Sequence, residues 1–404
     1  MNGCAARARR RRASGWTNRM DSGRLIVQVA PCYVDFNSES GGVANVVRQI
    51  CLGLTQHSNR VLLLCGNNEL GKIRAQPGIR KINDLLTVCV LAQHGNPLRG
   101  PTAELRKRLG EAASSGTCVA HVHTCFSALT ETAMSIFSER RIPFVFTPHG
   151  KLTRYMLSKH FALKWLWWHC VARRQVQKSA SIALCSAVES VAFSALGLHA
   201  PWTVVPNGYS LPPLAPTAFL AEKPFVLFLG YLDARKQPEF LVRAFAQSTT
   251  RFTHQLLFVG PDEYEYRKVI AREVEKQGLG SRVIFAGALY GADKWACLTS
   301  AACLCLPSRG EGLPVVMCEA LGAGVPQIYS TDCNFNEVAS AGAGIMVDGF
   351  NPNEWASAID RVCLHSETAD RMRIAAKELS AEYTWQKAID KWVAIYDSIE
   401  LKKQ

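Results

Sequence analysis

Short apolar runs alternate with stretches of helical periodicity along most of the chain. In the first half, the runs rich in β-branched residues are expected to form strands at residues 25–30, 60–65, 86–91, 119–123, 143–147, 181–185 and 202–205. In the second half, the expected strands lie at residues 225–229, 255–259, 282–285, 302–306, 326–329 and 344–347. Strands that alternate with helices are typical of parallel sheets covered by helices on both faces. The pattern therefore predicts an α/β protein with doubly wound parallel sheets.

A proline-rich segment separates the two blocks of strands. Pro206-Asn207-Gly208 is soon followed by three more prolines in residues 211–216, and such a segment cannot form a central strand or a helix interior. We therefore predict an N-terminal Rossmann-like domain over residues 21–208, a linker over 209–222 and a C-terminal Rossmann-like domain over 223–380. A final helix within 381–404 is expected to pack back across the domains.

Two such domains place a cleft between the carboxyl ends of their sheets, where these folds bind ligands.

The amino-acid composition is that of an ordinary globular protein. The 404 residues are 48% hydrophobic and 20% charged, which excludes a wholly disordered, collagen-like or coiled-coil chain. The apolar stretches are too short or too interrupted to cross a bilayer, which takes about 20 residues.

The formal net charge of +13 is unevenly distributed. Residues 1–20 hold six arginines and no acidic residue, and they lack the apolar core of a secretory signal. We expect a disordered basic leader. Either translation truly begins at Met20, or the leader is a basic arm that contacts anionic lipid or nucleic acid.

The fifteen cysteines are scattered and mostly occupy apolar runs. No Cys-x-x-Cys pair occurs, and Cys303 and Cys305 have no further ligands nearby in the sequence. The cysteines are therefore interpreted as small hydrophobic residues in a reducing cytoplasm, and no metal site is expected.

The segment after residues 302–306 carries the clearest candidate chemistry. A polar loop with glycines is followed by Pro314, which suits the first turn of a helix. Free N–H groups at a helix start form an anion site. Glu311 lies in the loop and Glu319 lies in the helix, so both carboxylates can face the cleft, and each can accept two hydroxyl hydrogen bonds. The alternative is that both are solvated surface residues.

Glu311 and Glu319, spaced eight residues apart and followed by Gly324-Val325-Pro326, resemble the signature of the retaining GT-B glycosyltransferases of family 4, the glycosyl transferases group 1. The resemblance extends over nearly the whole chain after Met20. It includes the segments Gly41-Gly42-Val43, His121-Val122-His123, Thr147-Pro148-His149-Gly150, Val205-Pro206-Asn207-Gly208, 228–236 and 333–337.

The resemblance implies roles for individual residues. Glu319 would bind the nucleotide ribose, and Glu311 would lie beside the donor sugar with the amides of Gly312 and Leu313. Lys236 would neutralise the donor diphosphate. Tyr231 stands where the family has an arginine, and Arg235 is the candidate for the missing charge.

On the N-terminal side, the resemblance implies that Gly41 and Gly42 approach the donor phosphate and that His149 lies near the donor sugar. The alternatives are a simple strand-to-helix turn and a structural histidine. Enzymes of the GT-A type hold a metal ion with an Asp-x-Asp motif, which is absent from this sequence. Metal-independent catalysis by His149, Glu311 and Lys236 is therefore expected, with no cofactor besides the donor.

Residues 151–178 are basic and aromatic at helical density. They could lie against anionic lipid headgroups, or the tryptophans could pack inside the N-terminal domain. No helix-turn-helix or other nucleic-acid motif accompanies them. Residues 66–73 nearly spell a phosphate-binding P-loop, but Ile73 replaces the hydroxyl that binds magnesium.

The resulting hypothesis is a retaining hexosyltransferase. It would move a hexose from a nucleotide diphosphate sugar to a glycan acceptor that is lipid-linked, for a surface polysaccharide, in the cytoplasm or at the inner face of the cytoplasmic membrane. One alternative is a catalytically silent GT-B partner protein. Another is an epimerase or phosphorylase on the same scaffold.

Overall fold

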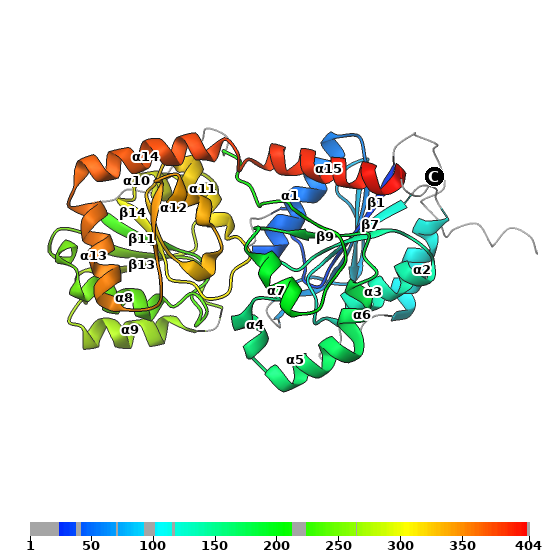
Figure 1. Cartoon of the computed structure of the whole chain (residues 1–404), viewed down its shortest axis with the longest axis horizontal. Helices are drawn as coiled ribbons and strands as arrows, with labels where there is room; N and C mark the ends of the chain where they lie inside the picture. Colours follow the sequence, from blue (N-terminus) through cyan, green and yellow to red (C-terminus); the bar gives the residue numbers. More distant parts are fainter. Residues whose placement is uncertain are drawn as a thin grey trace, which may run out of the picture.

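The computed structural model describes residues 24–37, 42–69, 72–92, 102–114, 118–211, 224–263 and 265–401. Within these residues the chain forms two α/β lobes that lie side by side (Figure 1). The N-terminal lobe runs from blue to green and the C-terminal lobe from green to orange. The basic leader predicted over residues 1–20 and most of the expected linker lie outside the described residues.

The N-terminal lobe is built on one sheet with the strand order β10-β9-β8-β7-β1-β2-β6-β5. Its strands are β1 (Leu25–Ala30), β2 (Arg60–Gly66), β5 (Gly78–Lys81), β6 (Leu86–Leu91), β7 (Cys118–His123), β8 (Phe144–Thr147), β9 (Ser181–Leu184) and β10 (Trp202–Val204). The inner strands are buried along their length because helices cover both faces, which is why they consist of continuous apolar runs.

One edge of this sheet departs from the parallel pattern. The exposed strand β5 pairs antiparallel with β6. The two short strands β3 (Asn68–Glu69) and β4 (Lys72–Ile73) form an antiparallel hairpin after β2. This hairpin stands where a P-loop would need a helix, so the near match to that motif binds no phosphate in the P-loop manner.

Helices flank the N-terminal sheet. They are α1 (Gly42–Gln56), α2 (Thr102–Ala113), α3 (Ala128–Glu139), α4 (Arg154–Ser158), α5 (Phe161–Trp167), a π-helical turn (Trp168–Ala172), α6 (Arg173–Val176) and α7 (Glu189–Ala195). Figure 1 shows α4 and α5 protruding below the body of the lobe.

The C-terminal lobe repeats the architecture with a parallel sheet in the order β13-β12-β11-β14-β15-β16. Its strands are β11 (Phe225–Leu229), β12 (Gln255–Val259), β13 (Val283–Gly287), β14 (Cys303–Leu306), β15 (Gln327–Ser330) and β16 (Gly344–Val347). Its helices are α8 (Pro238–Gln247), α9 (Arg267–Lys276), α10 (Gly291–Ser300), α11 (Val315–Ala323), α12 (Asn336–Ser340), α13 (Pro352–Cys363) and α14 (Ser366–Ser380), with 3₁₀ turns at Thr249–Phe252 and Thr331–Cys333.

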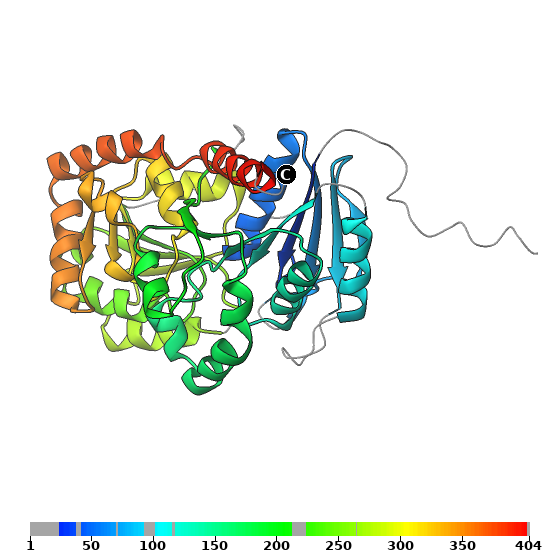
Figure 2. The ribbon, with the colours of Figure 1, turned by 45° about the vertical axis from the view of Figure 1, so that its right-hand side comes forward.

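The last helix, α15 (Trp385–Leu401), returns to the N-terminal lobe, and Figure 2 shows it passing over the top of the molecule after α14. Its buried face joins the core of that lobe through Ile389, Trp392 and Tyr396. Ile389 packs so closely on α1 that a Cβ atom on Gly53 would lie 2.4 Å from it. The two connections between the lobes run together, because Tyr209 pairs with Thr384.

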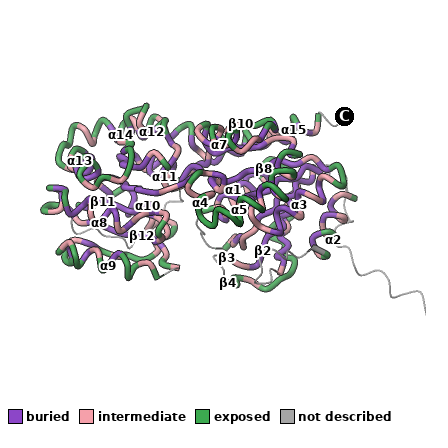
Figure 3. The backbone as a smooth tube through the Cα atoms, turned by 60° about the horizontal axis from the view of Figure 1, so that its bottom comes forward, coloured by how far each residue is buried: buried purple, intermediate pink, exposed green. Residues whose placement is uncertain are grey.

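Burial follows the layers, with purple strands inside and green segments on helix surfaces (Figure 3). Among the described helices, none has the length and apolarity to traverse a bilayer.

Candidate active site

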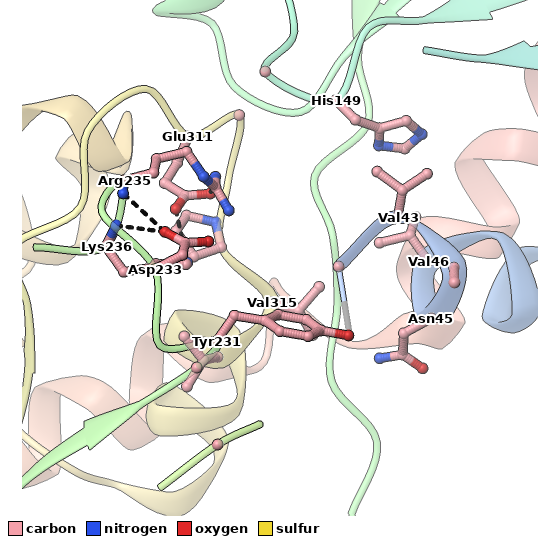
Figure 4. Close-up of a pocket in the computed structure, with 18 of the residues that line it drawn as sticks. Val43, Asn45, Val46, His149, Tyr231, Asp233, Arg235, Lys236, Glu311 and Val315 are labelled. Carbon is pink, nitrogen blue, oxygen red and sulfur yellow. Dashed lines mark hydrogen bonds and ion pairs between the residues drawn. The ribbon is translucent and has the colours of Figure 1, made fainter. Parts of the chain in front are cut away.

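A pocket of about 940 Å³ lies between the two lobes, at the carboxyl ends of both sheets. Its lining contains every predicted site residue that the structure describes, namely Gly42, His149, Arg235, Lys236, Glu311, Gly312, Leu313 and Glu319. Gly41 lies outside the described residues. Figure 4 shows Arg235, Lys236 and Glu311 gathered on one side of the pocket, with His149 and Val43 on the other.

Glu311 is the centre of a buried ion-pair cluster. Its carboxylate lies 2.8 Å from the guanidinium of Arg235 and 2.7 Å from the Nζ of Lys236. Burial alone would raise the pKa of Glu311, but the two cations outweigh it and lower the pKa to about 2. The carboxylate is therefore ionised at neutral pH, and both cations are held at the pocket wall.

The turn after β11 presents these cations. Asp233 Oδ1 accepts hydrogen bonds from the backbone nitrogens of Arg235 and Lys236, both at 2.9 Å, so the turn is fixed by its own side chain. Tyr231 also lines the pocket. Arg235, although four residues from the position where the family has its arginine, is thus the guanidinium that reaches Glu311.

Glu319 lies on α11 and is paired with a residue that the sequence did not single out. Its Oε1 lies 2.9 Å from the Nζ of Lys294, and both side chains line the pocket. Lys294 comes from α10, and no recognisable motif surrounds it. Pro314 is the N-cap of α11, so the free N–H groups of the first turn face the same space.

His149 follows β8 with a left-handed backbone, φ 49°. Its Nε2 lies 2.9 Å from the Nδ1 of His123, and its Nδ1 lies 4.0 Å from the thiol of Cys185. Burial, with a smaller effect from the charge of Lys151, lowers the pKa of His149 to about 3. The ring is therefore neutral at physiological pH. His121 and His123 are fully buried behind it.

Lys151 is a further cation in the pocket wall, two residues after His149. Burial lowers its pKa, and the charge of Arg235 acts in the same direction. Among the described residues no carboxylate lies within ion-pair distance of its Nζ. Its position beside the motif histidine was the only sequence signal that it could belong to the site.

The two lobes touch each other at the wall of the pocket. The side chain of Asn207, at the end of the N-terminal lobe, donates a hydrogen bond of 2.7 Å to the carbonyl of Leu313. Gly150 and Gly312 meet directly, with no room for a side chain on either. The segments tagged by sequence in both lobes therefore meet around one space.

Residues 151–178 separate into buried and exposed parts. Trp168 is buried and Trp167 packs against the core, so the packing alternative holds for these two tryptophans. We define the basic-aromatic patch by nine side chains of this segment, all exposed except the half-buried Lys164, which are Arg154, Lys159, Phe161, Leu163, Lys164, Trp165, Leu166, Arg173 and Arg174. Its four apolar side chains are 51–62% exposed. Lys159 and Met156 also line the pocket, so the patch adjoins the pocket mouth.

Among the described residues, no group of three or more His, Cys, Asp or Glu side chains is placed to hold a metal ion.

Comparison with known proteins gives two family models and many relatives. Residues 40–211 match the Glycosyltransferase Family 4 model, and residues 215–379 match the model described as glycosyl transferases group 1. The D-inositol 3-phosphate glycosyltransferase of Corynebacterium jeikeium is 25% identical over 182 residues, 43% of each chain. The phosphatidyl-myo-inositol mannosyltransferase of Mycobacterium leprae is 29% identical over 204 residues, 48% of this chain and 53% of that protein. The chain thus spans about half the length of the curated relatives it matches.

Solved structures agree over more of the chain. Sucrose-phosphate synthase from Thermosynechococcus elongatus superimposes with a TM-score of 0.73 and 19% identity, covering 94% of this chain and all of that one. Anabaena HepE, solved in complex with UDP and glucose, gives a TM-score of 0.69 and 17% identity, covering 93% of this chain and all of that one. These likenesses confirm the predicted fold. With the two family models side by side from residue 40 to residue 379, the chain belongs to the GT-B glycosyltransferases of family 4.

Proposed function

We propose that this protein transfers a hexose from a nucleoside diphosphate sugar to a hydroxyl of a glycan acceptor, with retention of the anomeric configuration. One observation carries the proposal. A single pocket between the lobes brings together the Glu311 cluster, the Glu319–Lys294 pair, the first turn of α11 and the neutral His149.

The charges of the pocket suit a diphosphate. The described pocket lining holds six positive side chains and five carboxylates, which leaves one positive charge besides the free N–H groups of α11. The positive residues are Arg74, Lys151, Lys159, Arg235, Lys236 and Lys294, and the carboxylates are those of Asp35, Asp233, Glu263, Glu311 and Glu319. An anion at this place gains charge-assisted hydrogen bonds in a site partly shielded from water. Glu319 is placed one and a half turns farther along α11, where its carboxylate can accept the ribose hydroxyls of the same nucleotide.

The same groups serve the chemical step. The bond between the anomeric carbon and the diphosphate oxygen breaks, and the acceptor hydroxyl oxygen forms the new bond to that carbon. Negative charge grows on the departing diphosphate, where Lys236, Arg235 and the α11 amides stabilise it. In a retaining reaction the acceptor approaches the face from which the diphosphate leaves, so a diphosphate oxygen can take the hydroxyl proton. We propose that these fixed positive groups stabilise the departing diphosphate without a metal ion.

The relatives support this class of reaction. HepE was solved with UDP and glucose, and separately with UDP-glucose, on the same fold. The names of the curated relatives describe glycosyl transfer to D-inositol 3-phosphate and mannosyl transfer to phosphatidyl-myo-inositol. Acceptors with phosphate or lipid attached to a polyol are thus found among relatives of this chain.

A lipid-linked acceptor fits the surface around the pocket. No acidic residue occurs between residues 151 and 178, whereas seven lysines and arginines do. The basic-aromatic patch combines these charges with exposed Phe161, Trp165 and Leu166, which is the composition that binds an anionic membrane surface. We therefore propose that the protein works at the cytoplasmic face of the membrane, on a glycan destined for a surface polysaccharide.

The proposal is tested by a panel of nucleotide sugars in thermal unfolding, followed by product analysis. A donor at 100 times its Kd should stabilise the protein by about 2.7 kcal/mol. With that donor and a lipid-diphosphate glycan, NMR of the product should show the donor's anomeric configuration. Inversion would refute retention. Binding without turnover for any acceptor would favour a silent partner protein, and an altered sugar without an acceptor would favour an epimerase.

A further inference from the structure

A chain of five hydrogen bonds leads from the pocket into the interior of the N-terminal lobe. The distances are 2.9 Å for His149 Nε2 to His123 Nδ1, 2.7 Å for His123 Nε2 to Gln28 Oε1, 3.2 Å for Gln28 Nε2 to Tyr396 Oη, 2.8 Å for Tyr396 Oη to His121 Nδ1 and 2.8 Å for His121 Nε2 to Thr147 Oγ1. Gln28, His121, His123 and Tyr396 are all fully buried. This series of hydrogen bonds is therefore closed to solvent except at His149.

Each histidine in the chain is neutral. Burial lowers the pKa of His121 and of His123, and the neighbouring histidines act in the same direction. A neutral imidazole carries one N–H and one bare nitrogen, so each ring donates at one nitrogen and accepts at the other. The hydrogen bonds along the chain must consequently all run in one direction.

The amide of Gln28 sets that direction. Its Oε1 can only accept, so His123 donates from Nε2 and keeps Nδ1 bare. His149 must then donate from Nε2 to that bare nitrogen. On the other side, the Nε2 of Gln28 donates to Tyr396, whose hydroxyl donates in turn to His121.

We propose that His123 and Gln28 are positioning residues that hold His149 in one tautomer, with Nε2 protonated and Nδ1 bare toward the pocket. The bare Nδ1 accepts a hydrogen bond from a sugar hydroxyl in the pocket, a consequence that rests on the proposed function. Nδ1 lies 4.0 Å from the thiol of Cys185, which also lines the pocket, and a sugar hydroxyl can replace this long contact with a shorter hydrogen bond. The tautomer itself requires no ligand.

The test is a long-range ¹H–¹⁵N correlation spectrum of the full chain labelled with ¹⁵N-histidine, without substrate at pH 7. The chain has ten histidines, so the His149 signals are assigned by their loss in His149→Gln. We expect the His149 pattern of a protonated Nε2 and a bare Nδ1. In His123→Phe and in Gln28→Met, the pattern should change to the average of two tautomers, because the fixed acceptor or its orientation is lost.

Thr147→Val is the matched control. Thr147 is the last residue of β8, two residues before His149, and its hydroxyl is the far end of the series of hydrogen bonds. Removing that hydroxyl should therefore leave the His149 pattern unchanged. A protonated Nδ1 on His149 in the parent would overturn the proposal. It would also be overturned if His149 kept the parent's pattern in Gln28→Met. This second variant keeps the test decisive if His123→Phe fails to fold. Both NMR measurements are made without substrate, so they can succeed or fail independently of the proposed transferase activity.

Discussion

Gly150 and Gly312 touch across the boundary between the lobes: a Cβ atom on Gly150 would lie 2.4 Å from the backbone nitrogen of Gly312. A Cβ atom on Gly312 would in turn lie 2.9 Å from the backbone nitrogen of Gly150. His149 and Glu311 directly precede these two glycines. The contact therefore sets the distance between the neutral histidine of one lobe and the buried carboxylate of the other.

Replacing Gly150 should separate the two halves of the site. Gly150→Ala places a methyl group against the Gly312 backbone and adds about 1–2 kcal/mol of strain at φ +73°. Because a displacement of about 1 Å can cost 100-fold in rate, we expect transfer to fall by about that factor. Gly278→Ala is the control, since it has a similar φ of +65° but open space around it. Equal losses of activity in both variants would disprove a role for the contact.

The two glutamates should differ in nucleotide binding. Glu319→Ala removes the proposed ribose contact, so affinity for the bare nucleoside diphosphate should fall about 10- to 100-fold, as for a hydrogen bond to a charged group. Glu311→Ala frees Arg235 and Lys236 to meet the phosphates, so binding should persist while transfer is lost. Isothermal calorimetry measures both, with the exposed Glu354→Ala as control. Parent-like binding by Glu319→Ala would contradict the assignment.

Activity should survive removal of divalent metal ions. The proposed stabilisation of the leaving diphosphate comes from Lys236, Arg235 and the α11 amides, none of which EDTA affects. The initial rate with and without EDTA should agree within about twofold, whereas Lys236→Gln should lower it by about 100-fold or more. Restoration of a lost rate only by added magnesium or manganese would count against metal-independent transfer.

Most strands could be predicted within two residues because buried parallel strands are continuous apolar runs between turns. β11, for example, begins and ends where the pattern places it. The exposed strand β5 was not predicted. Its residues, Gly78–Lys81, are held by pairing with β6 rather than by burial, so they lack an apolar signal.

The site was predictable where its residues belong to a contiguous motif, as with Glu311 and Lys236. Lys294 could not be predicted, because no motif surrounds it. Only its contact in the folded structure, from α10 to Glu319 on α11, marks it as part of the site. Gln28 and Tyr396 lie 368 positions apart and meet only when α15 packs back on the N-terminal lobe. Nothing in either segment indicates that contact, since a buried glutamine and a buried tyrosine resemble other core residues until their partners are placed.

The depressed pKa of His149 has a measurable effect on stability. A histidine whose pKa is lower in the folded state than in the unfolded state stabilises the fold above its unfolded pKa of about 6.5, and that stabilisation is lost as the pH falls toward 3. Between pH 6.5 and 5 the parent should lose about 2 kcal/mol relative to His149→Gln. Thermal unfolding across this range measures the difference. Parallel curves for the parent and His149→Gln would show that His149 is not held neutral.

The basic-aromatic patch should bind anionic vesicles in a salt-dependent manner. Each lysine or arginine near such a surface contributes about 1 kcal/mol, and the attraction falls off within a Debye length of about 8 Å at physiological salt. We expect a chain beginning at Met20, which lacks the arginines before it, to sediment with anionic vesicles at low salt and to be released at high salt. Substituting Lys159, Lys164, Arg173 and Arg174 by Gln should abolish sedimentation. Substituting the exposed Arg272, Lys276, Arg361 and Arg371 of the C-terminal lobe by Gln removes the same charge and should leave sedimentation unchanged.

Trp165→Ser should weaken binding to anionic vesicles without changing its salt dependence, because it removes apolar contact and leaves the charges in place. Equal sedimentation of all these variants would assign membrane binding to another surface, and no sedimentation of the Met20 chain would leave the acceptor to be sought among soluble glycans.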